Sequence, residues 1–233
     1  LYAFGAFNGW DPLNSVEFTY VDGVYVLENI ELAGDKNFGL ATIQTSDWNA
    51  LASYRYGFKQ DNAVATEGEA MAIVQGTGAI KAPATGVYNI VVDMSAMTVT
   101  LNWVDYLPKL YVFGNVGTSH WSTTEGVALA HIGEGVYKGV VDVAGAGEFT
   151  FVTVRGASWN DVNKDVRYGS LSAGQQLSVD ETTDAEVSMT NDKWGSTTNW
   201  KLASGTYTMT VDIVNCTLKV ELGDKVGVEN VVV

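Results

Sequence analysis

The 233-residue chain contains a single cysteine, Cys216, and only three prolines. One cysteine cannot form a disulfide within the chain, so the fold has to be stabilised by its hydrophobic core. Basic residues are also scarce, with 13 lysines and arginines against 27 aspartates and glutamates. The net charge of -14 argues against nucleic-acid binding, because that binding depends on Lys and Arg contacts to phosphate. No run of 18 apolar residues occurs, so we expect neither a membrane-spanning helix nor a signal peptide in this sequence.

Hydrophobic residues make up 46% of the chain, which is enough for a core, and they are arranged in an internal repeat. The opening "LYAFG" of Leu1–Gly5 returns as "LYVFG" in Leu110–Gly114, and Trp10 has its match in Trp121. Four further blocks match in the same order: "GVY" at 23–25 and 135–137, "FGLAT" at 38–42 with "FTFVT" at 149–153, "RYG" at 55–57 and 167–169, and "GVYNIVVDMSAMTVTL" at 86–101 with "GTYTMTVDIVNCTLKV" at 205–220. Matches in one order indicate a tandem duplication.

Both copies have the residue pattern of β-structure. Segments such as 24–27 are rich in β-branched and aromatic residues, and 206–212 alternates apolar with polar residues. Only 65–74 has a helical period. About six to eight short strands per copy predict an all-β protein made of two tandem immunoglobulin-like antiparallel β-sandwich domains.

Each copy is expected to form one domain, at 1–104 and 110–222, followed by a C-terminal tail at 223–233. The linker Val104–Pro108 is short and not rich in Gly or Ser, which predicts limited freedom between the domains. We expect a monomer. The chain opens directly on strand-like residues, Leu1–Phe4, so we expect it to be part of a longer protein whose targeting segment is not in this sequence.

Four tryptophans occupy turn-like positions. Trp10 and Trp121 follow polar, glycine-containing stretches, whereas Trp48 and Trp159 lie between Asp or Ser and Asn. A tryptophan there is either folded into the core or kept exposed for binding, and position alone leaves both interpretations open. The surroundings favour binding, because planar polar side chains accompany the second tryptophan of each copy. These candidates are Gln44, Asn49, Arg55 and Tyr56 in the first copy and Arg155, Asn160, Arg167 and Tyr168 in the second.

Flat aromatic faces beside planar hydrogen-bonding groups suit a sugar ring. One face of a pyranose carries only C–H groups, which stack on an aromatic ring, while its equatorial hydroxyls need donors and acceptors in the ring plane. Two stacks and a few hydrogen bonds predict weak binding, on the order of 10–1000 μM per site. Two weak sites on one chain gain avidity on a polymer, so we expect a long, neutral polysaccharide as ligand. Trp194, in an insertion of the second copy, either widens the aromatic surface there or packs on the surface.

The same residues resemble the tandem C-terminal starch-binding domains of SusE/SusF-type outer-membrane lipoproteins of Bacteroidetes. The shared motifs are "LYAFGAFNGWD" and "LYVFGNVGTSHW", "GVY", "FxFxT" followed by a tryptophan, "RYG" and "GTYTMTVD". The stretch "FGAFNGWDP" also resembles the start of glycogen-recognition modules in branching enzymes. Both relatives are β-sandwiches that bind α-glucan. The resemblance implies these site residues: Trp10, Trp48, Arg55 and Tyr56, and Trp121, Trp159, Arg167 and Tyr168.

The resemblance also implies a ligand, a location and partners. It predicts starch or another α-glucan as ligand, the extracellular face of the outer membrane or secretion as location, and other outer-membrane glycan-uptake proteins as partners. The final "GVENVVV" resembles the start of short tails that end secreted Bacteroidales proteins. One position departs from the family pattern. The centre of the "FxF" strand, often a sugar-binding Lys, is Gly39 or Thr150, which either changes the sugar specificity or leaves this role to Gln44 and Arg155.

No residue pattern indicates catalysis. Asp93 and Asp212 match between the copies, but they stand at strand-to-turn corners, where Asp commonly caps a turn. The segment "DVNKD" at 161–165 has calcium-loop spacing but lacks the glycine that such a loop requires. His120 and His131 accompany no nucleophile motif or phosphate loop. We therefore expect a non-catalytic protein without metal or cofactor; the alternatives are a structural or adhesive tandem that contacts proteins, its tryptophans buried, and an accessory module of a larger glycoside hydrolase.

Overall fold

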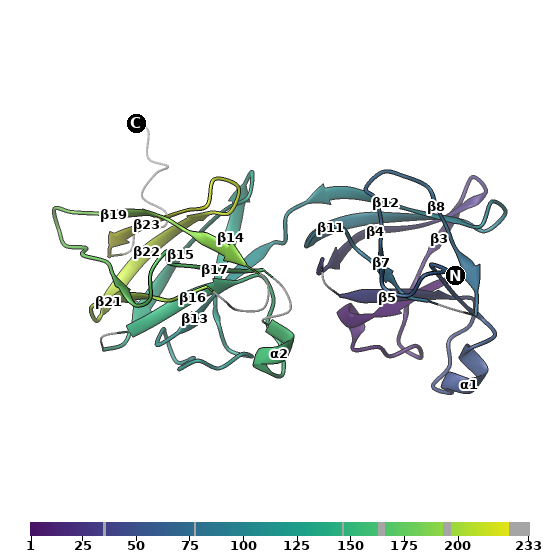
Figure 1. The fold of residues 1–233 in the computed structure, drawn as a ribbon, viewed down its shortest axis with the longest axis horizontal. Helices are drawn as coiled ribbons and strands as arrows, with labels where there is room; N and C mark the ends of the chain where they lie inside the picture. Colours follow the sequence, from purple (N-terminus) through teal and green to yellow (C-terminus); the bar gives the residue numbers. More distant parts are fainter. Residues whose placement is uncertain (35, 77, 146, 163–165, 193–196, 224–233) are drawn as a thin grey trace. The chain divides into compact units, whose positions relative to one another are not determined.

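The structure is a computed structural model that describes residues 1–34, 36–76, 78–145, 147–162, 166–192 and 197–223. It divides into two compact units, Leu1–Asp105 and Tyr106–Val233 (Figure 1). The described residues are almost entirely strands and turns, which confirms the prediction of an all-β fold. Trp194, most of the "DVNKD" segment and the predicted tail from residue 224 onward lie outside the described residues.

The first unit consists of two sheets. Its described strands are β1 (Tyr2–Gly5), β2 (Val16–Glu17), β3 (Thr19–Val21), β4 (Val24–Leu32), β5 (Asn37–Ala41), β6 (Arg55–Gly57), β7 (Ala63–Val64), β8 (Met71–Ala72), β9 (Val74–Gln75), β10 (Ile80–Lys81), β11 (Gly86–Asp93) and β12 (Thr98–Asp105). One sheet has the order β2-β1-β5-β10-β7, with β6 pairing β5 and β9 pairing β6, and the other has the order β3-β4-β11-β12-β8. Nearly all pairs are antiparallel, as expected for an immunoglobulin-like sandwich.

The second unit repeats this layout with one difference. Its described strands are β13 (Lys109–Gly114), β14 (Val127–Gly133), β15 (Val136–Val143), β16 (Gly147–Val152), β17 (Arg167–Gly169), β18 (Gln175–Gln176), β19 (Ala185–Ser188), β20 (Thr190–Asp192), β21 (Trp200–Leu202), β22 (Gly205–Asp212) and β23 (Thr217–Leu222). β14 pairs with both β13 and β15 and so links the two halves of the sandwich. In the first unit the matching stretch is divided at Phe18 into β2, which pairs with β1, and β3, which pairs with β4.

Strand alternation decides which side chains fill each core. β11 is buried at every second residue, and Tyr88 is one of the residues inside. The Tyr88 hydroxyl donates to the carbonyl of Ala84 at 2.7 Å, and the matching Tyr207 hydroxyl donates to Ala203 at 3.1 Å. Burial raises the pKa of Tyr88 to about 12. A tyrosine that bonds back to the preceding backbone is a recurrent feature of immunoglobulin-like sandwiches.

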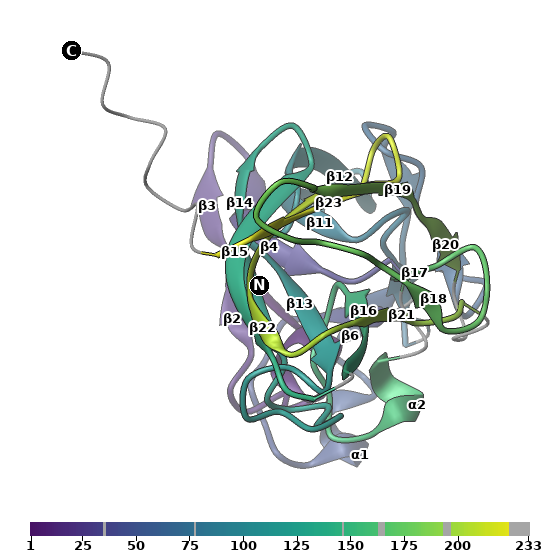
Figure 2. The same cartoon turned by 90° about the vertical axis from the view of Figure 1, so that its left-hand side faces the viewer.

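Three details differ from the sequence-based expectations. Each unit has more strands than the six to eight expected, because many pairings are only two or three residues long. The stretch 65–74 is not helical and contains β8. One-turn helices, α1 (Trp48–Leu51) and α2 (Trp159–Val162), occur where turns or strand ends were expected. Figures 1 and 2 show α2 at the lower end of the second unit, near β13 and β16.

Candidate functional site

The candidate site of the first unit is built on the outer face of β1, β5 and β6. In these ladders Phe4 lies opposite Gly39, and Ala41 lies opposite Arg55. Residues directly opposite each other point to the same side of a sheet, so all four lie on the face turned away from the main core. There Phe4 and Ala41 form a small separate cluster with Leu51 of α1.

Phe4 brings the two tryptophans of the first unit together. The ring centroids of Trp10 and Trp48 each lie 5.9 Å from that of Phe4, at interplanar angles of 74° and 72°. The two indoles are therefore at most twice this distance apart, although one comes from the loop after β1 and the other from α1. Phe4 is buried, whereas Trp10 is 38% and Trp48 is 44% exposed. We call Trp10 and Trp48, supported by Phe4, the first platform.

The loop that carries Trp10 is held by the side chain of Asn8. Its Oδ1 accepts the backbone N–H of Gly5 at 2.9 Å, and its Nδ2 donates to the carbonyls of Asp11 at 2.8 Å and Asn14 at 3.2 Å. Trp10 itself has φ of 59°, and its backbone N–H bonds the carbonyl of Gly5 at 2.8 Å. A non-glycine residue with positive φ is uncommon and persists where surrounding bonds fix it. The "FNGW" sequence therefore builds a specific loop whose end is the indole.

Trp48 is oriented by the start of α1. Asp47 precedes the helix in an extended conformation, and its carboxylate accepts the backbone N–H groups of Asn49 and Ala50. An aspartate in this position satisfies N–H groups that the first helical turn leaves unpaired. Leu51, one turn after Trp48, is buried in the same cluster as Phe4, so both residues of the helix pack toward that ring. The short helix thus fixes the backbone of Trp48 while its indole stays partly exposed.

Gly39, the departure from the family pattern, allows Phe4 to occupy its position. A Cβ atom at Gly39 would lie only 3.1 Å from the Phe4 ring. The second unit has the buried Thr150 there, and the ring of Phe113 lies instead against Gly126, where a Cβ atom would lie 2.0 Å away. The Phe4 ring therefore lies over β5, whereas the Phe113 ring lies against the residue that precedes β14, and the two platforms differ in shape.

In the second unit the two tryptophans contact each other directly. The ring centroids of Trp121 and Trp159 are 5.9 Å apart with an interplanar angle of 50°. Trp159 also packs edge-on against Phe113 at 5.8 Å and 84°. Both tryptophans are half-buried. We call Trp121 and Trp159, supported by Phe113, the second platform; it is more compact and less exposed than the first.

The matching arginines of the two units have different surroundings. Arg167 donates from Nε to Oγ1 of Thr150 at 3.1 Å and from Nη2 to Oδ1 of Asn199 at 2.5 Å. Burial lowers the pKa of Arg167, and hydrogen bonds led by that from Asn199 lower the pKa of Glu148. Among the described residues, the guanidinium of Arg55 has no hydrogen-bond or ion-pair partner. Arg167 is therefore part of the fold, whereas the donors of the Arg55 guanidinium are unused within the described residues.

Gln44 and Arg155, at matching positions, are both tied to neighbouring loops. The Gln44 amide donates to the carbonyl of Ser15 at 3.1 Å. The Arg155 guanidinium lies 4.7 Å from the ring centroid of Tyr111, and its Nη1 donates to the carbonyl of Thr124 at 3.2 Å. Tyr111 packs in the same cluster as Trp159, so Arg155 stands at the edge of the second platform. Stacking on an aromatic ring leaves the edge of the guanidinium open for hydrogen bonds.

The remaining predicted residues divide between surface and core. Asn49 and Asn160 are exposed, each directly after the tryptophan that begins α1 or α2. Tyr168 is buried in the main core and Tyr56 packs against the core of its unit. Successive residues of a strand point to opposite faces, so each Arg-Tyr pair is divided by its sheet. The prediction that Tyr168 contacts a ligand is therefore wrong, because the sheet lies between its ring and the platform.

Sequence reasoning overlooked Tyr54. This residue is 45% exposed and lies between α1 and β6, where its backbone N–H bonds the carbonyl of Leu51 at 2.8 Å. The internal repeat gives no signal for it, because the second copy has Val166 at the matching position. The sequence feature that could have identified Tyr54 is an aromatic residue directly before Arg55. Tyr54 is therefore an exposed aromatic residue of the first unit that has no aromatic counterpart in the second unit.

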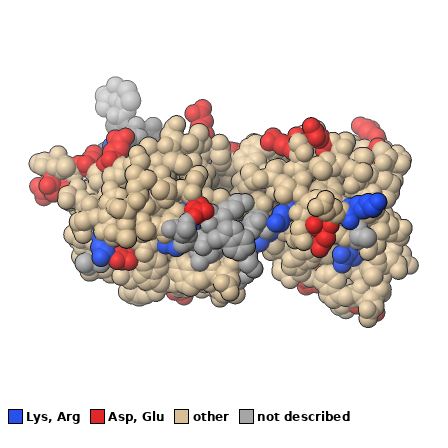
Figure 3. Space-filling model, viewed as in Figure 1, with Lys and Arg blue, Asp and Glu red and all other residues tan. Residues whose placement is uncertain are grey.

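Figure 3 shows mostly uncharged residues on the visible face, with acidic groups scattered over both units. In the part of the chain that the structure describes, no three His, Cys, Asp or Glu side chains gather as a metal would require. No helix in that part is long and apolar enough to cross a bilayer.

No family model and no curated protein matches the chain. Among solved structures, the crystal structure of SusF from Bacteroides thetaiotaomicron is similar, with 18% sequence identity and a TM-score of 0.37. The match covers 96% of this chain and 48% of that one, so the chain spans about half the length of that protein.

Proposed function

We propose that the protein is a non-catalytic glycan-binding protein in which each platform stacks a neutral polysaccharide, starch or another α-glucan. The observation that carries the proposal is the convergence of Trp10 and Trp48 on the buried Phe4, with more than a third of each indole exposed. Folding alone favours burial of so large an apolar side chain. A pair held open by dedicated loops is what a stacking surface requires.

The geometry of the second platform favours a curved glycan. The rings of Trp121 and Trp159 are inclined by 50°, so together they present a bent surface. An α-linked glucan chain curves from one sugar to the next and can place successive rings on two inclined indoles. A flat, β-linked ribbon such as cellulose fits coplanar rings better. Starch-like chains are therefore the proposed ligands, in agreement with the sequence resemblance.

Polar side chains around each platform supply the hydrogen bonds. In the first unit these are Arg55, Asn49 and Gln44, and in the second Arg155 and Asn160. Each hydrogen bond in a wet groove contributes roughly 1 kcal/mol net of lost water, and each stack about 0.5–1.5 kcal/mol beyond area burial. Affinity per site is therefore weak, and the two sites gain by acting on one polymer. The net charge of -14 repels polyanions, which also favours a neutral ligand.

The proposed cellular location and partners follow from the size of the ligand. A polysaccharide too large to enter a cell has to be bound outside it, so we place the protein at the extracellular face of the outer membrane or among secreted proteins. Other outer-membrane glycan-uptake proteins are the proposed partners there. The SusF structure, whose chain is about twice as long, belongs to a protein of the family that the sequence resembles.

The direct test is affinity gel electrophoresis with amylopectin, pullulan and a polysaccharide that is not a glucan. Migration should be retarded by the two α-glucans and not by the third. The same gels should be run with Trp48→Ala and with Val64→Ala, a control that truncates another exposed apolar residue outside the platforms. Retardation should decrease with the first substitution only. If both variants and the wild type are retarded equally, the result contradicts the proposed function.

A further inference from the structure

An aromatic pair in the second unit is covered by the chain that precedes β13. His131 of β14 lies opposite Tyr137 of β15, with ring centroids 5.2 Å apart. Three successive residues cover this pair. The ring of Tyr106 lies 5.7 Å from His131, the carbonyl of Leu107 accepts the Tyr137 hydroxyl at 3.0 Å, and the carbonyl of Pro108 accepts the His131 backbone N–H at 3.0 Å.

The first unit has an aromatic pair at the matching position, but the ring on its outer strand is exposed. Tyr20 of β3 lies opposite Tyr25 of β4, with ring centroids 4.9 Å apart. Tyr20 is 63% exposed, whereas Tyr137 in the second unit is only 2% exposed. Within the described residues, the Tyr25 hydroxyl has no hydrogen-bond partner. β3 is also the end strand of its sheet, while the matching β14 has a neighbour on both sides.

The hairpin geometry leaves the Tyr20 backbone available at this edge. Asp22 and Gly23 form the two-residue turn between β3 and β4, both with positive φ. Such a turn makes its flanking pair, Val21 and Val24, hydrogen-bonded, so the next pair is not. The N–H and C=O of Tyr20 therefore point away from β4, as the N–H of His131 does when it reaches Pro108.

We propose that Tyr20, Tyr25 and the open edge of β3 form a docking site for an extended peptide segment with the chemistry of Tyr106–Pro108. The occupant is a stretch joined to Leu1 from its N-terminal side. The register requires this direction: the Phe18 N–H bonds the carbonyl of Leu1 at 2.9 Å, and Leu1 matches Leu110 in the repeat. A segment that continues β1 toward the N-terminus would therefore contact Tyr20 in the way that Pro108 and Tyr106 contact His131.

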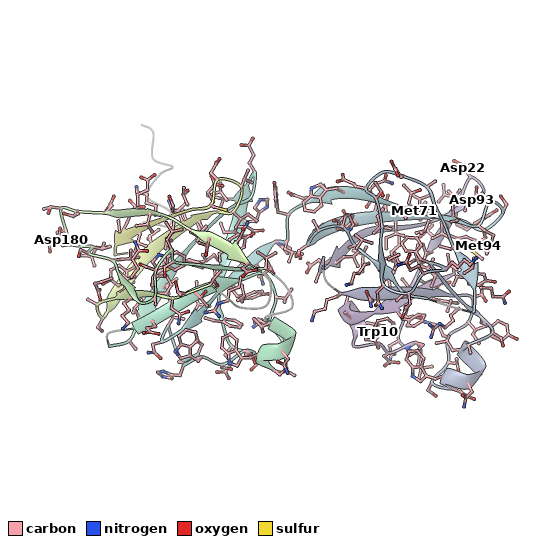
Figure 4. All side chains as sticks on the ribbon, viewed as in Figure 1. Trp10, Asp22, Met71, Asp93, Met94 and Asp180 are labelled. Atoms are coloured by element: carbon pink, nitrogen blue, oxygen red, sulfur yellow. The ribbon has the colours of Figure 1, made fainter. Side chains whose placement is uncertain are left out.

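Each group of the docking site gains a partner from such a segment. An aromatic side chain covers Tyr20, one carbonyl accepts the Tyr25 hydroxyl and the next accepts the Tyr20 N–H. Addition of an extended segment to an open sheet edge is an established mode of peptide recognition. The site is separate from the first platform, since Figure 4 shows Trp10 and Asp22, at the tip of the β3–β4 hairpin, on opposite sides of the unit.

The test adds a copy of residues 106–109 (Tyr-Leu-Pro-Lys) directly before Leu1 of the full chain. Amide hydrogen exchange at Tyr20 should slow by about fivefold, as expected for one new hydrogen bond. The unfolding midpoint of the first unit should also rise. An otherwise identical extension with Ser in place of the aromatic residue should give a smaller effect. In the second unit, Tyr106→Ser should speed exchange at His131.

Two outcomes would overturn the proposal. The first is unchanged Tyr20 exchange and unchanged stability in the extended protein, since the added segment then finds no site. The second is protection of Tyr20 in the original chain by maltoheptaose, which would make this edge a glycan surface. Trp10→Ala and Trp48→Ala leave the docking site intact, so loss of glycan binding and loss of docking are measured separately.

Discussion

Phe4 packs edge-on against Trp48, with ring centroids 5.9 Å apart at 72°, and Phe113 repeats the contact with Trp159 at 5.8 Å and 84°. In each unit a phenylalanine near the C-terminal end of the first strand thus contacts the first residue of a one-turn helix. The phenylalanine is buried in both units, so it supports the indole and does not itself offer a stacking face. The contact explains how an exposed indole can be held in one orientation.

Replacing Phe4 with a smaller residue should reduce glycan affinity more than it reduces the stability of the fold. We expect Phe4→Leu to lower the free energy of unfolding by about 1 kcal/mol, because Leu fills most of the same volume. Both indoles of the first platform lose their edge-on partner, so glycan affinity of that unit should fall. Denaturant unfolding and calorimetry with maltoheptaose measure the two effects. Unchanged affinity would show that the indoles are oriented without Phe4.

Gly39 should not tolerate a larger side chain. Gly39→Thr, which copies the second unit, puts atoms into the space of the Phe4 ring and should cost about 1–3 kcal/mol of stability. Because Phe4 is displaced, the fluorescence of Trp10 and Trp48 should change as well. The opposite substitution, Thr150→Gly, should leave the fluorescence of the second platform nearly unchanged, since Phe113 leans toward Gly126. Equal spectra for wild type and Gly39→Thr would contradict this packing.

The two arginines should respond differently to replacement. Arg167→Met leaves Thr150 and Asn199 without their donor and should destabilise the second unit by about 1–3 kcal/mol. Arg55→Met removes no bond within the described residues, so stability should change little while glycan affinity of the first unit decreases. Thermal unfolding and calorimetry of both variants check the contrast. Equal destabilisation by the two substitutions would disprove it.

Acid should weaken the turn that follows β11. A hydrogen bond from Ser95, helped by the Ala96 N–H, lowers the pKa of Asp93. Because the folded pKa lies below the unfolded value of about 3.9, the stabilisation is present above that value and is lost as pH falls through the folded pKa. Denaturant unfolding between pH 5 and about pH 2 should therefore show a smaller loss of stability for Asp93→Asn than for wild type. If the stability of the two proteins falls in parallel as pH decreases, the Asp93 turn does not contribute to the pH dependence of stability.

Much of the fold follows from local patterns in the sequence. Alternation in 206–212 and the repeated "GVY" predicted strands with one buried face, and the structure confirms an all-β sandwich. The helix at Trp48 was not predicted, because one turn capped by Asp47 is too short to show a helical period. The break at Phe18 was also missed, since it depends on which neighbouring strand each half pairs with.

The candidate site was predictable in part. The loop tryptophans stood out because they lie at turn-like positions in both copies. The division of each Arg-Tyr pair follows from the strand period, but the repeat of "RYG" as one block conceals it, so the motif alone does not show that Tyr168 is buried. Tyr54 escaped notice because it is absent from the second copy. The bonds of Arg167 to Asn199 join residues far apart in the sequence, so only the folded chain reveals them.

The most direct measurement is calorimetric titration of maltoheptaose into the full chain, Trp48→Ala, Trp159→Ala and the double variant. Each single substitution removes one stack worth about 0.5–1.5 kcal/mol, so one class of sites should weaken by up to roughly tenfold while the other persists. In the double variant both classes of sites should weaken to the same extent. If the double variant binds maltoheptaose as tightly as wild type, the exposed indoles are not the glycan-binding surface.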